Sequence, residues 1–187
     1  VGVAASAEGP NIRAQMKIHK ECLVHLLKRV VTVIDKKIRL PILGHVLFQA
    51  EQGRLHATAT DIETEVTASV EFYEARGLPV FTAPGQELYK LCRSLPRGAV
   101  LDLIQVPLTE PEGRLKVTVG TFSTSMDSLD HEGFPRFVAS WSGESAKIDA
   151  QALRYALEKS MFAMAQQDVR FYLNGLLLEV EGGFLRA

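Results

Sequence analysis

Several carboxylates and histidines have the chemistry for catalysis or metal binding, but their spacing argues against both roles. Asp61, Glu63 and Glu65 alternate along one segment, so in a strand they would share one face. No histidine or nucleophile accompanies them, and we interpret them as a solvated acidic face. The histidines show no HExxH or paired ligand spacing; they are His19, His25, His45, His56 and His131. Phosphate-binding glycine loops and nucleophile elbows are also absent from the sequence. We therefore expect no catalytic residue, no cofactor and no metal.

Basic and acidic side chains are distributed unevenly along the first part of the chain. Residues 17–40 carry seven basic against two acidic side chains, whereas residues 51–75 carry one basic against six acidic. A positive helical surface attracts phosphate backbones without sequence preference. On charge alone, an ordinary solvated helix with a lysine bias explains the pattern equally well, so both interpretations stay open at this point.

Hydrophobic periodicity predicts the elements that would position these charges. Between residues 20 and 34 apolar side chains recur at helical spacing, and the predicted buried stripe is Leu23, Leu26, Leu27, Val30, Val31 and Ile34. A second helix is expected at 86–95. Strands are expected at 16–19, 40–50, 54–60, 61–72, 78–83, 100–106, 114–119 and 122–128, and the alternation in 61–72 places Ile62 on the buried face. Residues 16–128 thus contain a strand, a helix and three strands, twice over.

One unit of about forty residues occurs twice, at 17–57 and again at 147–187. The copies align without a gap at an offset of 130, pairing Leu23 with Leu153, Leu27 with Leu157 and Gly53 with Gly183. A long ungapped self-match is typical of a duplicated structural unit. Asp149 is the predicted N-cap of the helix in the second copy.

Length and composition set ordinary limits. The chain has 187 residues, 47% of them hydrophobic, and a formal net charge of −1. Cys22 and Cys92 are far apart and form no CxxC pattern, which favours a reduced, cytosolic protein over a disulfide framework or a zinc site. No apolar run approaches the ~20 residues of a membrane span. Residues 1–15 are interpreted as a non-native leader or an upstream start and are left out of the predicted fold.

Three segments resemble the bacterial sliding clamp family, the beta subunit of the DNA polymerase III holoenzyme. They are RLPILGHVLFQAEQGRLHATATDIETEV, LYKLCRSLP and MAQQDVRFYLNGLLLEVEG, and the similarity extends from Met16 to Ala187. The resemblance implies an α+β DNA-clamp fold, in which each domain consists of two helix-plus-antiparallel-sheet halves, with helices on the inner face and sheets outside. It also implies a ring of two subunits, each of three domains, around duplex DNA.

Site residues follow from the resemblance by position. The implied DNA contacts are Lys37, Gln86, Gln167, Phe171 and Tyr172, to which we add Arg39, Arg93 and Arg170 from their charge. Leu173 matches the rim of a pocket that binds short peptides of polymerases and clamp loaders. Glu87, Leu88 and Leu91 match the dimer interface. The offset of 130 pairs Lys37 with Gln167, so equivalent loops of successive domains would face the same DNA.

The predicted domain organisation is a complete first clamp domain at 16–131, a linker at 132–145 and the start of a second clamp domain at 146–187. The predicted function is a non-catalytic processivity factor of the bacterial cytoplasm, which tethers the replicative polymerase and other replication and repair proteins to DNA. The main alternative is a peptide-docking module that does not encircle DNA. A third possibility, a small-ligand-binding or enzymatic α+β domain, lacks any site that the sequence identifies.

Overall fold

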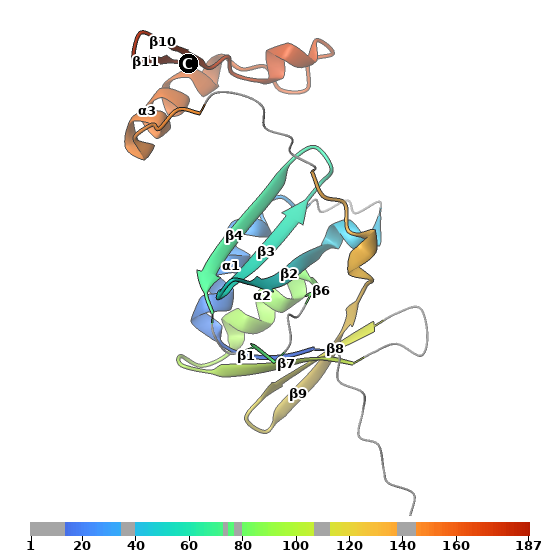
Figure 1. Ribbon diagram of the computed structural model, residues 1–187. Helices are drawn as coiled ribbons and strands as arrows, with labels where there is room; N and C mark the ends of the chain where they lie inside the picture. The colour runs from blue at the N-terminus through green and yellow to red at the C-terminus, as the bar shows by residue number, and fades with distance from the viewer. Residues whose placement is uncertain (1–13, 35–39, 73–74, 77–79, 107–112, 138–144) are drawn as a thin grey trace, which may run out of the picture. The chain divides into compact units, whose positions relative to one another are not determined.

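The computed structural model describes residues 14–34, 40–72, 75–76, 80–106, 113–137 and 145–187. The chain divides into two compact units, Val1–Val138 and Ala139–Ala187. Each unit is described by itself (Figure 1).

The first unit has the predicted order of a strand, a helix and three strands, repeated once, with one further short strand between the repeats. Its helices are α1 (Lys20–Val30) and α2 (Gly85–Ser94), with short 3₁₀ helices η1 (Pro41–Gly44) and η2 (His131–Gly133). Its strands are β1 (Ala14–His19), β2 (His45–Glu51), β3 (Arg54–Thr60), β4 (Glu65–Glu71), β5 (Ala75–Arg76), β6 (Val80–Pro84), β7 (Val100–Val106), β8 (Gly113–Val119) and β9 (Phe122–Ser128). This mixture of helices and antiparallel sheets confirms the predicted fold class.

The two repeats of the first unit exchange their opening strands. One sheet has the order β4-β3-β2-β6 and the other β5-β1-β7-β8-β9. The opening strand β1 therefore pairs with β7 of the second repeat, with Met16 opposite Leu103, while β6 pairs with β2 of the first, with Phe48 opposite Phe81. Because each sheet needs a strand from the other repeat, neither repeat has a complete sheet without its neighbour.

Helices α1 and α2 contact each other and cover the sheets, as Figure 1 shows. Helix α1 contacts β1, β3 and β4, and α2 contacts β2 and β6. The predicted stripe of α1 is buried along its whole length, through Val31 and Ile34. The helix itself ends at Val30 and not at residue 34, since residues 30–34 form a β-branched run, which lowers helix propensity.

Two predicted strands begin later than the sequence suggested. Residues 41–44 form η1 with Pro41 in its first turn, and β2 starts at His45. Likewise β4 starts at Glu65 and not at residue 61, because the Asp61 carboxylate accepts hydrogen bonds from the N–H of Thr64 at 2.6 Å and of Glu63, closing a turn. Ile62 lies in this turn with φ 80° and is 52% exposed, so its predicted burial was wrong.

Both predicted ends of the first domain differ from the structure. Strand β1 begins at Ala14, and the Gln15 amide donates to the Asp102 carboxylate at 2.9 Å, so the last two residues of the predicted leader belong to the fold. After residue 131, Phe134 is buried and Arg136 pairs with Glu65 at 3.1 Å. Residues 131–137 thus pack on the first unit, and the linker predicted from 132 begins too early.

The second unit repeats the first copy at the predicted offset of 130. Its elements are α3 (Ala150–Ser160), η3 (Met161–Ala163), η4 (Phe171–Asn174), β10 (Glu179–Glu181) and β11 (Phe184–Arg186). Helix α3 corresponds residue for residue to α1, and η4 to η1. The hairpin turn also recurs, because Gln52 and Gly53 and their counterparts Gly182 and Gly183 all have positive φ. Asp149 caps α3 as predicted, accepting from the N–H groups of residues 151 and 152.

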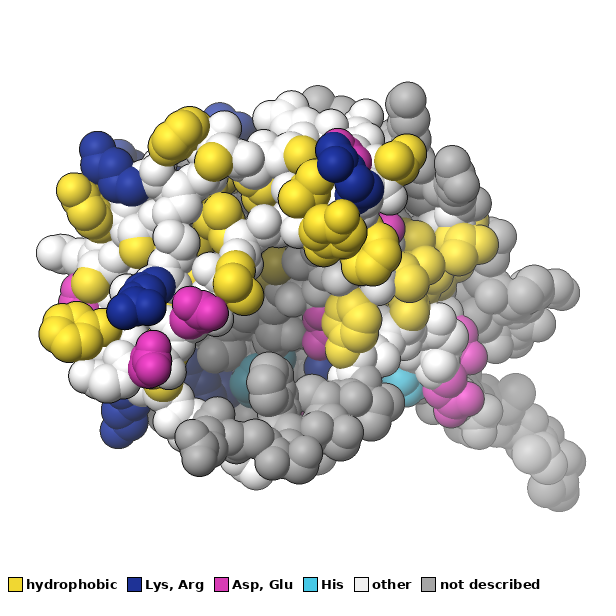
Figure 2. Space-filling model, turned by 90° about the horizontal axis from the view of Figure 1, so that it is seen from above, with side chains coloured by type: hydrophobic (Ala, Val, Ile, Leu, Met, Phe, Trp, Pro, Cys, Tyr) yellow, Lys and Arg dark blue, Asp and Glu magenta, His cyan; other side chains and the backbone are white. Residues whose placement is uncertain are grey.

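The duplicated helices differ in burial. Helix α1 has four buried residues, whereas α3 has none within the described structure of its unit. Large apolar side chains of the second unit are exposed, among them Phe162, Phe171, Leu177 and Phe184. Figure 2 shows many hydrophobic side chains on the face turned to the viewer, interspersed with basic and acidic groups.

Candidate nucleic-acid interface

Exposed basic side chains lie on both helices of the first unit. Lys28 and Arg29 are in the last turn of α1, and Lys90 and Arg93 are on α2. The Arg93 guanidinium lies 5.8 Å from the centre of the Tyr89 ring, a cation–π geometry. Since α1 and α2 contact each other, their basic groups belong to one helical layer. Lys37 and Arg39 lie outside the described residues.

The ends of α1 and α2 are tied together by polar side chains. The Gln86 amide at the start of α2 donates to the Val31 carbonyl at the end of α1, at 3.2 Å. At the opposite ends, the Lys20 ammonium of α1 donates to the Leu95 carbonyl that follows α2. These contacts satisfy carbonyl groups that helix ends leave without intrahelical partners. Gln86 therefore has a structural role that the sequence did not reveal, and its contact with DNA stays a prediction.

A third contact joins the same elements. The Glu21 carboxylate in the first turn of α1 accepts the Gly98 N–H at 3.0 Å. This hydrogen bond is the main reason that the pKa of Glu21 lies below its ordinary value. The acidic group thus fixes the loop after α2 against the start of α1.

The predicted dimer-interface residues have unequal access to a partner. Glu87 is exposed and Leu91 half-buried, but Leu88 is 0% exposed and belongs to the core of the first unit. The prediction for Leu88 is therefore corrected, since an inward-facing leucine of α2 cannot contact a second subunit in this conformation.

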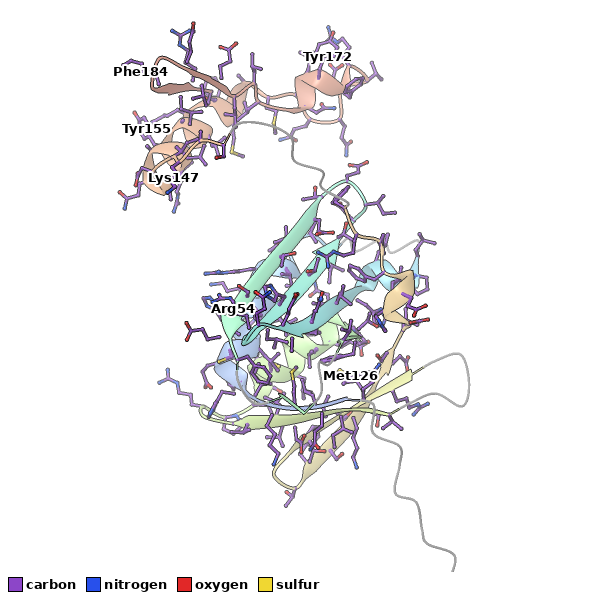
Figure 3. The ribbon with its side chains drawn as sticks, in the orientation of Figure 1. Arg54, Met126, Lys147, Tyr155, Tyr172 and Phe184 are labelled. Carbon is purple, nitrogen blue, oxygen red and sulfur yellow. The ribbon has the colours of Figure 1, made fainter. Side chains whose placement is uncertain are left out.

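In the second unit, the predicted DNA contacts lie together between η3 and the end of η4. Gln167 is exposed with a left-handed φ of 59°. Phe171 and Tyr172 are 83% and 67% exposed, and their rings meet edge to face with centroids 6.0 Å apart. Figure 3 shows Tyr172 on the opposite side of this unit from Tyr155 and Phe184. Exposed aromatic rings next to an amide can contact sugars or unstacked bases.

Arg170 of the same segment is exposed but paired with an acidic side chain, and Leu173 is half-buried. The Arg170 guanidinium donates to both carboxylate oxygens of Asp168, at 3.1 and 3.0 Å. This pairing lowers the pKa of Asp168 and raises the pKa of Arg170. The positive charge predicted to meet DNA is thus offset within the protein. Leu173, the predicted rim of a peptide pocket, is half-buried, and its N–H donates to the Arg170 carbonyl.

Two of the three acidic residues considered for catalysis, Asp61 and Glu65, have structural partners. Asp61 closes its turn, and the Glu65 carboxylate accepts from the Arg136 side chain and from the Phe137 N–H. Within the described ranges there is no group of three or more potential metal ligands. A cavity of about 80 Å³ is lined by Thr60, Ile62, Pro135, Arg136 and Phe137. It contains no nucleophile–base pair.

Comparison with known protein families shows to which family the chain belongs. Residues 14–138 match the model of the DNA polymerase III beta subunit, N-terminal domain. The chain belongs to the DNA polymerase III beta subunit family. Among its curated relatives, the beta sliding clamp of Pseudomonas aeruginosa is 35% identical over 170 residues and that of Escherichia coli 34% over 171. These alignments cover 91% and 90% of this chain, and 45% of each relative, so the chain spans about half the length of these proteins.

Solved structures of the family share the fold. The crystal structure of the DNA polymerase III subunit beta from Pseudomonas aeruginosa superposes with a TM-score of 0.82 at 34% identity, covering 91% of this chain and 45% of that one. A sliding clamp from the same organism bound to griselimycin gives a TM-score of 0.83 at 33% identity, covering 95% of this chain and 46% of that one.

None of the helices in the described part of the chain combines the length and hydrophobicity needed to cross a bilayer.

Proposed function

We propose that the intact protein is a DNA sliding clamp, a processivity factor that encircles duplex DNA and tethers the replicative polymerase and other replication and repair proteins. The observation that supports this most is the match to beta sliding clamps over 91% of the chain, together with their fold. The protein would perform no chemistry itself, act in the bacterial cytoplasm and bind the clamp loader through its peptide pocket.

The charges of the first unit suit a clamp that slides. Exposed basic groups on α1 and α2 provide separate ammonium and guanidinium charges. Such contacts hold phosphates without sequence preference and weaken with salt. Retention on DNA would therefore come from ring closure, while the side chains keep individual contacts weak enough to permit movement.

The proposed domain organisation follows the two units. The first clamp domain includes residues packed on the first unit through Phe137, the linker follows it, and residues 146–187 begin a second domain. The exposed apolar face of α3 supports this proposal, because the equivalent face of α1 is buried against α2 and the sheets. Two full-length subunits would close the ring head to tail.

The test uses the full-length protein and the alternative of a peptide-docking module. A variant with both Lys37 and Gln167 replaced by alanine is compared with the unsubstituted protein for loading on primed circular DNA. The clamp proposal predicts fewer loaded clamps and a weaker dependence of binding on salt, because one phosphate contact is lost. Unchanged loading and salt dependence would favour the docking module. Peptide binding, measured in parallel, should be the same in both proteins.

A further inference from the structure

A closed polar network organises the loop of residues 165–174, here called the clasp loop. The Asn174 side chain bridges both backbone groups of Asp168, since its Oδ1 accepts the Asp168 N–H at 2.9 Å and its Nδ2 donates to the Asp168 carbonyl at 3.0 Å. At the ends of the loop, the Ala165 N–H donates to the Leu173 carbonyl at 2.9 Å. The chain is thus closed at its base and again across its middle.

Asp168 holds the second half of this network. Its Oδ1 accepts the Arg170 N–H at 2.8 Å and the Arg170 Nε at 3.1 Å, while Oδ2 accepts Nη2 at 3.0 Å. The Leu173 N–H in turn donates to the Arg170 carbonyl at 2.9 Å. Hydrogen bonds between ionised partners are stronger than neutral ones. Gln167, next to Asp168, is held with φ 59°, a conformation that non-glycine residues rarely adopt without support from their surroundings.

The first copy of the repeat forms its 3₁₀ helix without the polar side chains of this network. At the offset of 130, Asp168, Arg170 and Asn174 correspond in sequence to Ile38, Leu40 and Gly44. The 3₁₀ helix η1 nevertheless forms at the position equivalent to η4, with a proline at its start. The three polar residues are therefore specific to the second copy.

The network orders three neighbouring side chains that are not part of it. Gln167, Phe171 and Tyr172 lie between or beside its members and are exposed. The hydrogen bonds of Asp168 and Asn174 constrain the backbone on both sides of these side chains. Ordering them before DNA arrives removes an entropy cost from binding.

We infer that Asp168 and Asn174 are positioning residues, which preorganise the clasp loop so that Gln167, Phe171 and Tyr172 contact DNA, and that Arg170 acts through Asp168 and not on a phosphate. This inference rests on the proposed function. It gives Asp168 an effect opposite to that expected from its charge: a carboxylate near DNA should oppose binding, whereas this one supports it.

The experiment measures DNA binding and loop order separately in the full-length protein. Asp168→Asn removes a negative charge and frees Arg170, yet we expect it to weaken binding to a primed duplex roughly three- to tenfold, a loss equal to the net value of about one hydrogen bond. Asn174→Ala should have a similar effect. Hydrogen exchange at the Asp168, Arg170 and Leu173 amides should accelerate in both variants.

The matched control is Glu158→Gln on α3. Glu158 pairs with Arg154 at 2.7 Å, so this change also removes one negative charge and frees an arginine in the same unit, but outside the clasp loop. It should leave loop exchange unchanged and bind DNA at least as well as the unsubstituted protein.

Two results would overturn the inference: tighter DNA binding by Asp168→Asn, as a freed phosphate-binding Arg170 would give, or unchanged amide exchange in both loop variants. Failure of the proposed function looks different, since the unsubstituted full-length protein would then not bind the primed duplex at all. An Arg170→Ala variant adds a further check. If Arg170 acts only through Asp168, the DNA-binding constant of this variant should fall with salt concentration as steeply as that of the unsubstituted protein.

Discussion

Replacing equivalent leucines in the two copies of the repeat shows how much the burial of this side chain contributes to the free energy of unfolding. Leu27 of α1 is 0% exposed and lies in the core, whereas its counterpart Leu157 of α3 is only half-buried. Truncating a buried leucine to alanine costs about 2–5 kcal/mol, because contacts are lost and a cavity remains. A half-exposed site leaves no enclosed cavity, so Leu157→Ala should cost less than about 1 kcal/mol. We therefore expect a difference of at least about 1 kcal/mol between the two variants.

Thermal unfolding of this 187-residue chain, followed by far-ultraviolet circular dichroism, measures the difference. At about 3 °C per kcal/mol for a chain of this size, Leu27→Ala should lower the melting temperature by about 9 °C for a cost of 3 kcal/mol. Leu157→Ala should shift it by no more than about 3 °C. Equal costs in this chain would refute the assignment of a covered α1 and an uncovered α3. In a full-length protein, where we propose that α3 is covered, the two costs should become similar.

Three further predictions concern individual side chains. Gly85→Ala would place its Cβ 2.5 Å from the Ile34 Cδ1, so we expect a loss of about 1–3 kcal/mol in urea unfolding, whereas Gly175→Ala, with no atom within 4 Å, should cost far less. Burial raises the pKa of the Cys92 thiol to about 12, so iodoacetamide at mildly alkaline pH should label it only after unfolding; native labelling seen by mass spectrometry would contradict this. A backbone N–H lowers the pKa of Glu21 below its ordinary 4.5, so its carboxylate stabilises the fold at neutral pH, and this contribution is lost as acid protonates it. The stability gap between Glu21→Gln and the unsubstituted protein should accordingly narrow below pH 4.5, and a constant gap would count against the contact.

Local patterns in the sequence were sufficient for much of the fold. The stripe of α1 was read from helical spacing, and each of its residues is buried. The duplication was visible in side-chain identities, and the structure repeats it down to the positive φ angles of the hairpin turns. Asp149 was recognisable as an N-cap because its side chain and the helix start are adjacent in the chain. In each case the decisive interaction joins residues near one another in sequence.

Features that depend on distant residues could not be read in the same way. The exchange of β1 and β6 between the sheets joins segments about 80 and 40 residues apart, and no local pattern encodes it. The ties from Gln86 to Val31 and from Lys20 to Leu95 likewise depend on how the helices pack.

Short-range polar chemistry explains one further error and one pairing that the sequence analysis did not foresee. The alternation of residues 61–72 favoured a strand, but the Asp61 turn interrupts it and exposes Ile62. Arg170 was chosen for its charge, yet Asp168 two residues away already occupies its guanidinium. A charge count therefore identifies basic residues without showing which of them remain available to DNA.

Encirclement is tested most directly by cutting the DNA after the protein has bound. Full-length protein is loaded onto a nicked circular plasmid, separated from unbound protein, and treated with a restriction enzyme that opens the circle once. A closed ring held by topology should remain on the uncut circle and slide off the ends of the cut DNA within the time of the assay. Equal retention on the circular and the cut DNA would contradict the proposal and indicate binding by direct contacts alone.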